Sequence, residues 1–251
     1  MTAGFSAKRR ASLLSGIVIR LVALAIIFGL IVFLPAGTIR YWPAWIYLAV
    51  LAVPMAGVMG YLLKNDPELL ERRFHHREKE TTQKAVVLVT TALFAAGFIV
   101  PAFDYRFGWS AVPAWAVATA DALVMAGYGF VFLVFRENSY ASRVVEIARG
   151  QRVISTGPYA VVRHPMYLGI TVMYLATPVA LGSWWGILPM LSLPVSLVVR
   201  LLNEETVMLR ELSGYARYCS RIRYRLIPGV WSIVINTVLG KPVFLPRLFI
   251  W

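Results

Sequence analysis

The sequence is poor in charge, cysteine and histidine. Only 15% of its 251 residues are charged and 59% are hydrophobic, whereas average soluble domains carry roughly 25% charge. The single cysteine, Cys219, has no partner for an internal disulfide, which excludes a disulfide-rich secreted module. The three histidines match no zinc or di-iron spacing, so we predict no metal site. This composition indicates an integral membrane protein.

Long apolar runs are abundant instead. About 20 mainly apolar residues suffice for a helix to cross a bilayer. Such runs occur at 12–34, 41–63, 85–103 and 112–135, and a longer one at 166–202 is divided at 181–183. We therefore predict an all-α, polytopic membrane protein with about six transmembrane helices. The first run exceeds 20 residues and contains no small-residue cleavage site, so we interpret it as a retained span and not as a signal peptide.

We expect a single structural domain with two parts. Residues 1–135 form an N-terminal four-helix transmembrane region, and residues 136–251 contain the helical hairpin 166–202 followed by a tail. The tail from 230 is interrupted by glycine and proline, and we expect it to lie at the membrane interface.

The net charge of +13 could indicate a nucleic-acid partner, but its placement predicts a topology instead. Twenty-one lysines and arginines fall on one side of the predicted spans, and only Arg40 and Arg106 fall on the other. Because basic loops remain in the cytoplasm, both termini are predicted to be cytoplasmic, in what we expect to be a bacterial inner membrane. The excess of positive charge is thus explained by cytoplasmic loops next to membrane lipids. We therefore predict membrane lipids as partners and no nucleic acid.

Polar residues concentrate at the cytoplasmic mouth of the last hairpin. Pro165 restricts the residue before it, so Arg163 and His164 are predicted to be held at the membrane surface. Across the hairpin, the last span ends near Arg200 and the Glu204-Glu205 pair. Two carboxylates at the end of an apolar helix need cations or solvent.

These residues supply three candidates for catalysis, Arg163, Arg200 and Glu204. Simpler interpretations stay open, because Arg163 can serve as a basic anchor and Arg200 can pair with Glu204 one turn later. Asp121 lies deep in the fourth predicted span, and an inter-helical hydrogen bond is the simpler role for it.

A longer pattern combines these elements. Gly157 to Gly169 reads G-x-Y-x-x-x-R-H-P-x-Y-x-G, and after it come the hairpin, the Glu-Glu pair, Gly214 and a basic stretch that ends at Pro228. This pattern resembles the isoprenylcysteine carboxyl methyltransferase family and is similar to the related membrane phospholipid methyltransferases. The resemblance covers roughly 140–229, and the earlier spans match only as hydrophobic helices.

The resemblance implies a cytoplasmic pocket for S-adenosylmethionine, enclosed by the C-terminal hairpin and its flanking segments. Four residues at 151–154 would line the adenosine, a tyrosine would close the pocket, and the R-H-P-x-Y region would hold the amino-acid end. The cofactor-binding residues carried over by motif are Glu146, Gln151, Arg152, Val153, Ile154, Tyr159, His164, Pro165, Met166, Tyr167 and Glu205.

One position departs from the family. Isoprenylcysteine enzymes carry an arginine one helical turn before the cofactor glutamate, where this chain has Leu201, and Arg200 is rotated from that position by about 100°. The predicted function is therefore methyl transfer from S-adenosylmethionine to an apolar or lipid-like molecule whose acceptor is a carboxylate, thiol or amine. The oligomeric state is left open, since glycines such as Gly16, Gly127 and Gly129 can pack helices within or between chains.

Two other functions match parts of the sequence. A membrane sterol-type reductase resembles this chain in its R-H-P-x-Y region but uses NADPH, whose 2′-phosphate would need cations such as Arg221, Arg223 and Arg225. The Glu204-Glu205 pair would repel those phosphates. A non-enzymatic transporter or scaffold is the third possibility, although transporters usually have repeated halves and none is visible here.

Overall fold

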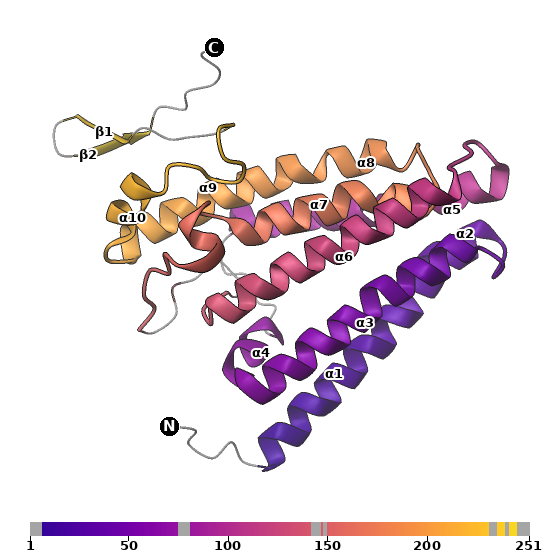
Figure 1. Ribbon diagram of the computed structural model, residues 1–251, viewed down its shortest axis with the longest axis horizontal. Coiled ribbons are helices and arrows are strands. Elements are labelled where there is room, and N and C mark those ends of the chain that lie inside the picture. The colour runs from indigo at the N-terminus through magenta and orange to yellow at the C-terminus, as the bar shows by residue number, and fades with distance from the viewer. Residues whose placement is uncertain are drawn as a thin grey trace.

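The computed structural model describes residues 7–74, 81–141, 147, 150–230, 235–238 and 241–244. Long helices run side by side along the long axis of the molecule (Figure 1). The elements in chain order are α1 (Ala7–Phe28), the π-helix η1 (Gly29–Phe33), α2 (Leu34–Ala36), α3 (Trp42–Asn65), α4 (Pro67–Phe74), α5 (Thr81–Phe107), α6 (Ala114–Glu137), the 3-10 helix η2 (Gly157–Ala160), α7 (Pro165–Ala180), α8 (Ile187–Leu191), α9 (Leu193–Glu211), α10 (Tyr215–Arg221), β1 (Ile235–Val238) and β2 (Lys241–Phe244).

The prediction of a polytopic helical membrane protein is confirmed. Four helical segments are long and apolar enough to cross a bilayer, namely Lys8–Ala36, Trp42–Asn65, Ala114–Glu137 and Ile187–Glu211. Two further helices correspond to the other predicted spans: α5 has 27 residues and α7 has 16. The number of six depends on these two and stays a prediction.

The predicted break in the last apolar run is a turn. The break predicted at 181–183 is the turn after α7, where Gly182 adopts a φ of +73° that favours glycine. The charged segment at 64–84 contributes the short helix α4, whose Leu69 and Leu70 are buried. The N-terminus of α1, α4 and α10 lie at one end of the bundle, and the turns after α2, α5 and α7 lie at the other (Figure 1).

The tail differs from a purely helical prediction. Strands β1 and β2 form an antiparallel hairpin in which Ile235 pairs with Phe244 and Val238 with Lys241. The β-branched residues of this segment favour an extended backbone over a helix.

A pair of glycines brings α6 and α7 close together. A Cβ on Gly127 would lie 2.9 Å from the Gly169 carbonyl oxygen, and one on Gly169 would lie 2.8 Å from the Val131 side chain. Gly127 therefore packs helices within the chain, whereas Gly129 meets nothing within 4 Å in the described structure. This contact positions α7, and with it the motif at its first turn.

The core joins the two predicted parts of the chain. Phe28 and Tyr47 from the N-terminal part pack in one cluster with Ala176 and Met190 from the C-terminal hairpin. At the end away from α10, the buried Asp104 carboxylate accepts hydrogen bonds from Ser110 and Ser183, which ties the end of α5 to the α7–α8 turn. The bundle thereby supports the opposite end of α7, where the polar motif lies.

Candidate functional site

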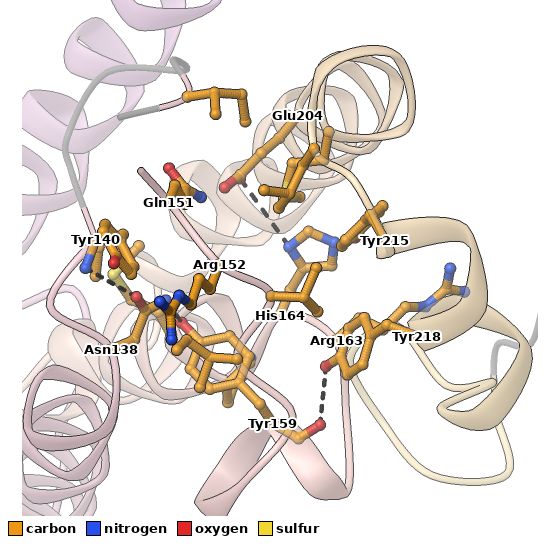
Figure 2. Close-up of a pocket in the computed structure, with 18 of the residues that line it drawn as sticks. Asn138, Tyr140, Gln151, Arg152, Tyr159, Arg163, His164, Glu204, Tyr215 and Tyr218 are labelled. Atoms are coloured by element: carbon orange, nitrogen blue, oxygen red, sulfur yellow. Dashed lines mark hydrogen bonds and ion pairs between the residues drawn. The ribbon is translucent and has the colours of Figure 1, made fainter. Parts of the chain in front are cut away.

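A pocket lies at the α10 end of the bundle, among the first turn of α7, the last turns of α9, and α10 (Figure 2). The segment 151–154 and the chain that follows α6 complete its wall. The lining residues are Asn138, Tyr140, Ala141, Ile147, Gln151, Arg152, Val153, Ile154, Tyr159, Arg163, His164, Pro165, Met166, Tyr167, Glu204, Val207, Met208, Leu212, Tyr215 and Tyr218.

The glycine-proline corner of the motif packs against the end of α6. Gly157 has a φ of +55°, and a Cβ there would lie 2.9 Å from a carboxylate oxygen of Glu137. The Thr156 hydroxyl donates a hydrogen bond to the same carboxylate. Glycine therefore suits this position in both backbone conformation and space. The corner begins the helix η2, which carries Tyr159.

Tyr159 is clamped from two sides. The Asn138 side-chain amide donates to its hydroxyl at 2.8 Å, and the Tyr218 hydroxyl donates to its main-chain carbonyl at 2.8 Å. Burial raises the pKa of Tyr159 to about 12, although the hydrogen bond from Asn138 acts in the opposite direction. Tyr159 is therefore a neutral, rigidly held ring on the pocket wall.

The entry into α7 is fastened to the chain that follows α10. The amide of Arg163 donates to the Tyr224 carbonyl at 3.0 Å, and that of His164 donates to the Arg225 carbonyl at 2.9 Å. Pro165 is the first residue of α7, where a missing N–H leaves no intrahelical bond unmade. The two segments thus hold the R-H-P motif at a defined angle.

A buried ion cluster surrounds Glu205. Its Oε1 lies 3.1 Å from Arg163 Nη1 and 3.3 Å from His164 Nε2. Its Oε2 accepts from both Nε and Nη2 of Arg225 at 2.9 Å. Burial lowers the pKa of Arg225, and the Glu205 carboxylate opposes that shift by stabilising the charged guanidinium. Both Glu205 oxygens are therefore engaged by cations of the protein itself.

The neighbouring Glu204 has a different environment. Its side chain is 31% exposed and borders the pocket. The Tyr167 hydroxyl donates to its Oε2 at 2.8 Å, and Arg200 Nε donates to that hydroxyl at 3.1 Å. His164 Nδ1 lies 4.0 Å from the same Oε2. Glu204 is thus a negative charge presented to the pocket and oriented by a tyrosine, an arrangement that suits a cationic ligand group.

The predicted cofactor residues gather around this one pocket. Nine of them, from Gln151 to Tyr167, line it. Glu205 lies behind the wall in the ion cluster, and Glu146 falls outside the described residues. Among the three catalytic candidates, Arg163 and Glu204 line the pocket, whereas Arg200 contacts it through Tyr167. The proximity is observed, and the binding roles stay predictions.

Sequence reasoning missed the contributions of α9 and α10. Val207 and Met208 line the pocket with Glu204, and Tyr215 lines it with Tyr218. Both sets have the i, i+3 or i, i+4 spacing of one helical face. This spacing was the signal in the sequence that could have identified these residues. It shows which residues share a helical face, but it does not show which face meets the pocket.

A comparison with known families bears on residues 115–214, which match the family described as phospholipid methyltransferase. The matched region runs from the first turn of α6 to the residue before α10 and includes most of the pocket wall. Together with the apolar helices, this match supports a membrane methyltransferase. The match over these residues confirms the resemblance to the phospholipid and isoprenylcysteine-type membrane methyltransferases that the motif indicated.

Proposed function

We propose that this protein transfers a methyl group from S-adenosylmethionine to an apolar or lipid-like acceptor at the cytoplasmic membrane surface. The observation that carries the proposal is the convergence on one pocket of the segment 151–154, Tyr159 and the first turn of α7. The family resemblance assigns these same residues to S-adenosylmethionine. The matched family supplies the reaction class.

The chemical groups on the wall suit such a methyl donor, which carries a cationic sulfonium and amino group, a carboxylate and a nucleobase. Glu204 presents a carboxylate for the cationic groups, and Arg163 with His164 supplies donors for the ligand carboxylate. Val153 and Ile154 offer apolar surface for the adenosine. Because Glu205 is enclosed by its own cations, we assign the ligand-facing role to Glu204.

The work required of the protein is mainly positioning. When bound, S-adenosylmethionine supplies a methyl group already activated on a sulfonium, which a nucleophile displaces in line. The clamped ring of Tyr159 and the Tyr167–Glu204 hydrogen bond hold their side chains in one orientation. An amine acceptor must first lose a proton, and Glu204 is the carboxylate on the wall that can take it.

The acceptor is expected to reach the pocket from the membrane side. Tyr167 and Pro165 belong to the apolar helix α7, so the pocket wall continues directly into the bundle. Leu201, at the position of the family's substrate arginine, is fully buried among apolar side chains. A carboxylate acceptor therefore lacks that arginine here, and we favour an amine or thiol on an amphiphile.

The three arginines named for the NADPH phosphate do not serve the reductase alternative. Arg221 and Arg223 are exposed and do not line the pocket, and Arg225 is engaged with Glu205. Glu204 on the wall would repel a phosphate. No observation favours a transporter.

Ligand-dependent thermal unfolding of the detergent-purified protein tests the proposal. S-adenosylhomocysteine, the product of the methyl donor, should stabilise the protein by about 2.7 kcal/mol at 100 times its dissociation constant, and NADPH should have no effect. Glu204→Gln should weaken this binding by about tenfold or more, since it removes a charge-assisted contact. The matched control is Glu211→Gln, an exposed residue of the same helix that lies off the pocket wall.

Stabilisation by NADPH alone would overturn the proposal in favour of a reductase. If neither ligand raises the melting temperature of a protein shown to be folded, the proposal is also rejected. If S-adenosylhomocysteine binds, incorporation of labelled methyl groups into amphiphiles that carry an amine, a thiol or a carboxylate then identifies the acceptor.

A further inference from the structure

A second cavity lies among α1, α3, α4 and α6. Figure 1 shows α1, α3 and α4 away from α9 and α10, which help to form the pocket of Figure 2. No described residue lines both hollows, so they are separate sites. The described lining of the second cavity is Arg20, Met55, Val58, Met59, Leu62, Leu70, Arg73, Phe74, Tyr128 and Phe135.

Arg20 brings a positive charge to this cavity from within a membrane span. It belongs to the helical segment Lys8–Ala36, which is long and apolar enough to cross a bilayer. A charged side chain inside a span is costly, and it usually faces a cavity or the interior of the bundle, where it marks a functional site. Arg20 therefore calls for a role beyond packing.

The contacts of Arg20 hold its charge near α4. Its Nη1 reaches back one helical turn and donates to the Gly16 carbonyl oxygen at 3.1 Å, and its Nη2 donates to the Phe74 carbonyl oxygen at 3.3 Å. Its Cζ lies 3.5 Å from the centroid of the Phe74 ring. The guanidinium is thus directed toward the start of α1, at the level where α4 crosses the end of α3.

Arg73 of α4 brings a second guanidinium to the same wall. Its Nη1 donates to the Ala141 carbonyl oxygen at 3.1 Å, and its Cζ lies 4.5 Å from the centroid of the Phe135 ring. Guanidinium groups present a planar fork of N–H donors that matches the oxygens of a phosphate or carboxylate. Two such groups on one cavity wall favour an anionic occupant, and the described lining contains no carboxylate that would oppose one.

The rest of the lining is apolar and belongs to a helix that faces the membrane. Met55, Val58 and Met59 lie on α3, which is long and apolar enough to span a bilayer, and all three are half-buried. Methionine side chains adapt to irregular apolar shapes. An occupant therefore meets cations next to α4 and apolar surface farther along α3, which is the pattern of an amphiphile with an anionic head.

We propose that this cavity binds an anionic phospholipid, with its phosphate between Arg20 and Arg73 and an acyl chain along Met55 and Val58. Basic pockets between membrane helices bind anionic head groups of this kind. A zwitterionic lipid suits the site less well, because its ammonium group would be repelled by the two arginines. The site is separate from the pocket of Figure 2, so the lipid should bind whether or not that pocket transfers methyl groups.

Thermal unfolding of the full chain in a neutral detergent tests this inference, with titration of dioleoylphosphatidylglycerol, dioleoylphosphatidylcholine or inorganic phosphate. Phosphatidylglycerol should raise the melting temperature and reach saturation, and phosphatidylcholine should need a concentration at least about tenfold higher. Arg20→Gln and Arg73→Gln should each weaken phosphatidylglycerol binding about tenfold, the value of a hydrogen bond to a charged group. Each variant is compared with its own lipid-free melting temperature, so that a loss of stability does not hide binding.

Arg10→Gln is the matched control. It removes the same charge from the same helix, at an exposed residue off the cavity wall, and it should bind phosphatidylglycerol as the parent does. Unchanged binding in both Arg20→Gln and Arg73→Gln would overturn the inference. An equal loss in Arg10→Gln would also overturn it, because binding would then reflect general attraction to a basic surface.

The choice of ligand supplies two further tests. Equal stabilisation by the two lipids would reject an anionic head group as the feature that is recognised. If inorganic phosphate alone reproduces the stabilisation and its loss in Arg20→Gln, the ligand is a free anion, which overturns the assignment to a lipid.

Discussion

Replacing Glu205 by glutamine tests whether the buried ion cluster holds the pocket together. The substitution keeps the shape of the side chain and removes its charge. Glu205 lies within 3.1 Å of Arg163 and within 2.9 Å of Arg225, and all three side chains are at most 4% exposed. Breaking a buried ion pair by removing one partner destabilises proteins by about 3–5 kcal/mol, because the other charge stays buried without compensation.

In Glu205→Gln, two arginines lose their shared counter-charge. We therefore expect the free energy of unfolding to fall by an amount at the upper end of that range. For chains of 150–250 residues, 1 kcal/mol corresponds to about 2–4 °C in melting temperature. Glu205→Gln should therefore lower the melting temperature by roughly 10–20 °C. The assay is tryptophan fluorescence during heating of the ligand-free protein in detergent, at one fixed scan rate.

Glu204→Gln is the matched comparison, since it makes the same chemical change one residue away. The Glu204 side chain is 31% exposed and its hydrogen-bond donor is Tyr167. We expect Glu204→Gln to lower the free energy of unfolding by at most about 1 kcal/mol. The reasoning is refuted if Glu205→Gln melts within a few degrees of Glu204→Gln. A double variant with Arg225→Met should recover part of the loss, because it removes one of the uncompensated charges.

Two further predictions concern buried polar groups away from the pocket mouth. Burial raises the pKa of the Cys219 thiol, so iodoacetamide at pH 8 should modify it far more slowly in the folded protein than in denaturant, as measured by mass spectrometry. Because the folded thiol has the higher pKa, its contribution to stability should decline only as the pH rises past the pKa of the unfolded thiol. Equal alkylation rates would contradict this. Asp121 is buried and neither of its carboxylate oxygens has a hydrogen-bond partner in the described structure, so Asp121→Asn should unfold at the same temperature or higher. A fall of about 2 kcal/mol in the free energy of unfolding would contradict this, because it would mean that the charge of Asp121 stabilises the fold.

Much of the pocket was predictable because its residues are close in the chain. The motif between Gly157 and Gly169 contains its own turn signals, and Pro165 sets the start of α7. Local constraints of this kind act whatever the rest of the fold does. The apolar runs likewise predicted about six spans, and four of the described helical segments are long and apolar enough to cross a bilayer.

The extended tail and the second half of the pocket wall were not predictable in the same way. The short strands β1 and β2 follow from β-branched residues in a segment that was expected only to lie at the interface. The pocket residues on α9 and α10 depend on how these helices are rotated against α7. Periodicity identifies a face of a helix but not the element that this face meets.

The division of roles between Glu204 and Glu205 shows where sequence ends and tertiary structure begins. The sequence by itself determined that two carboxylates stand at the end of an apolar helix, across a hairpin from an R-H-P motif, in a pattern that resembles the membrane methyltransferases. Tertiary structure alone decided that Glu205 points inward to Arg163 and Arg225 and that Glu204 borders the pocket. The physical reason is that neighbours on a helix point about 100° apart, so the packing of α9 against α7 and the chain after α10 selects which one is buried.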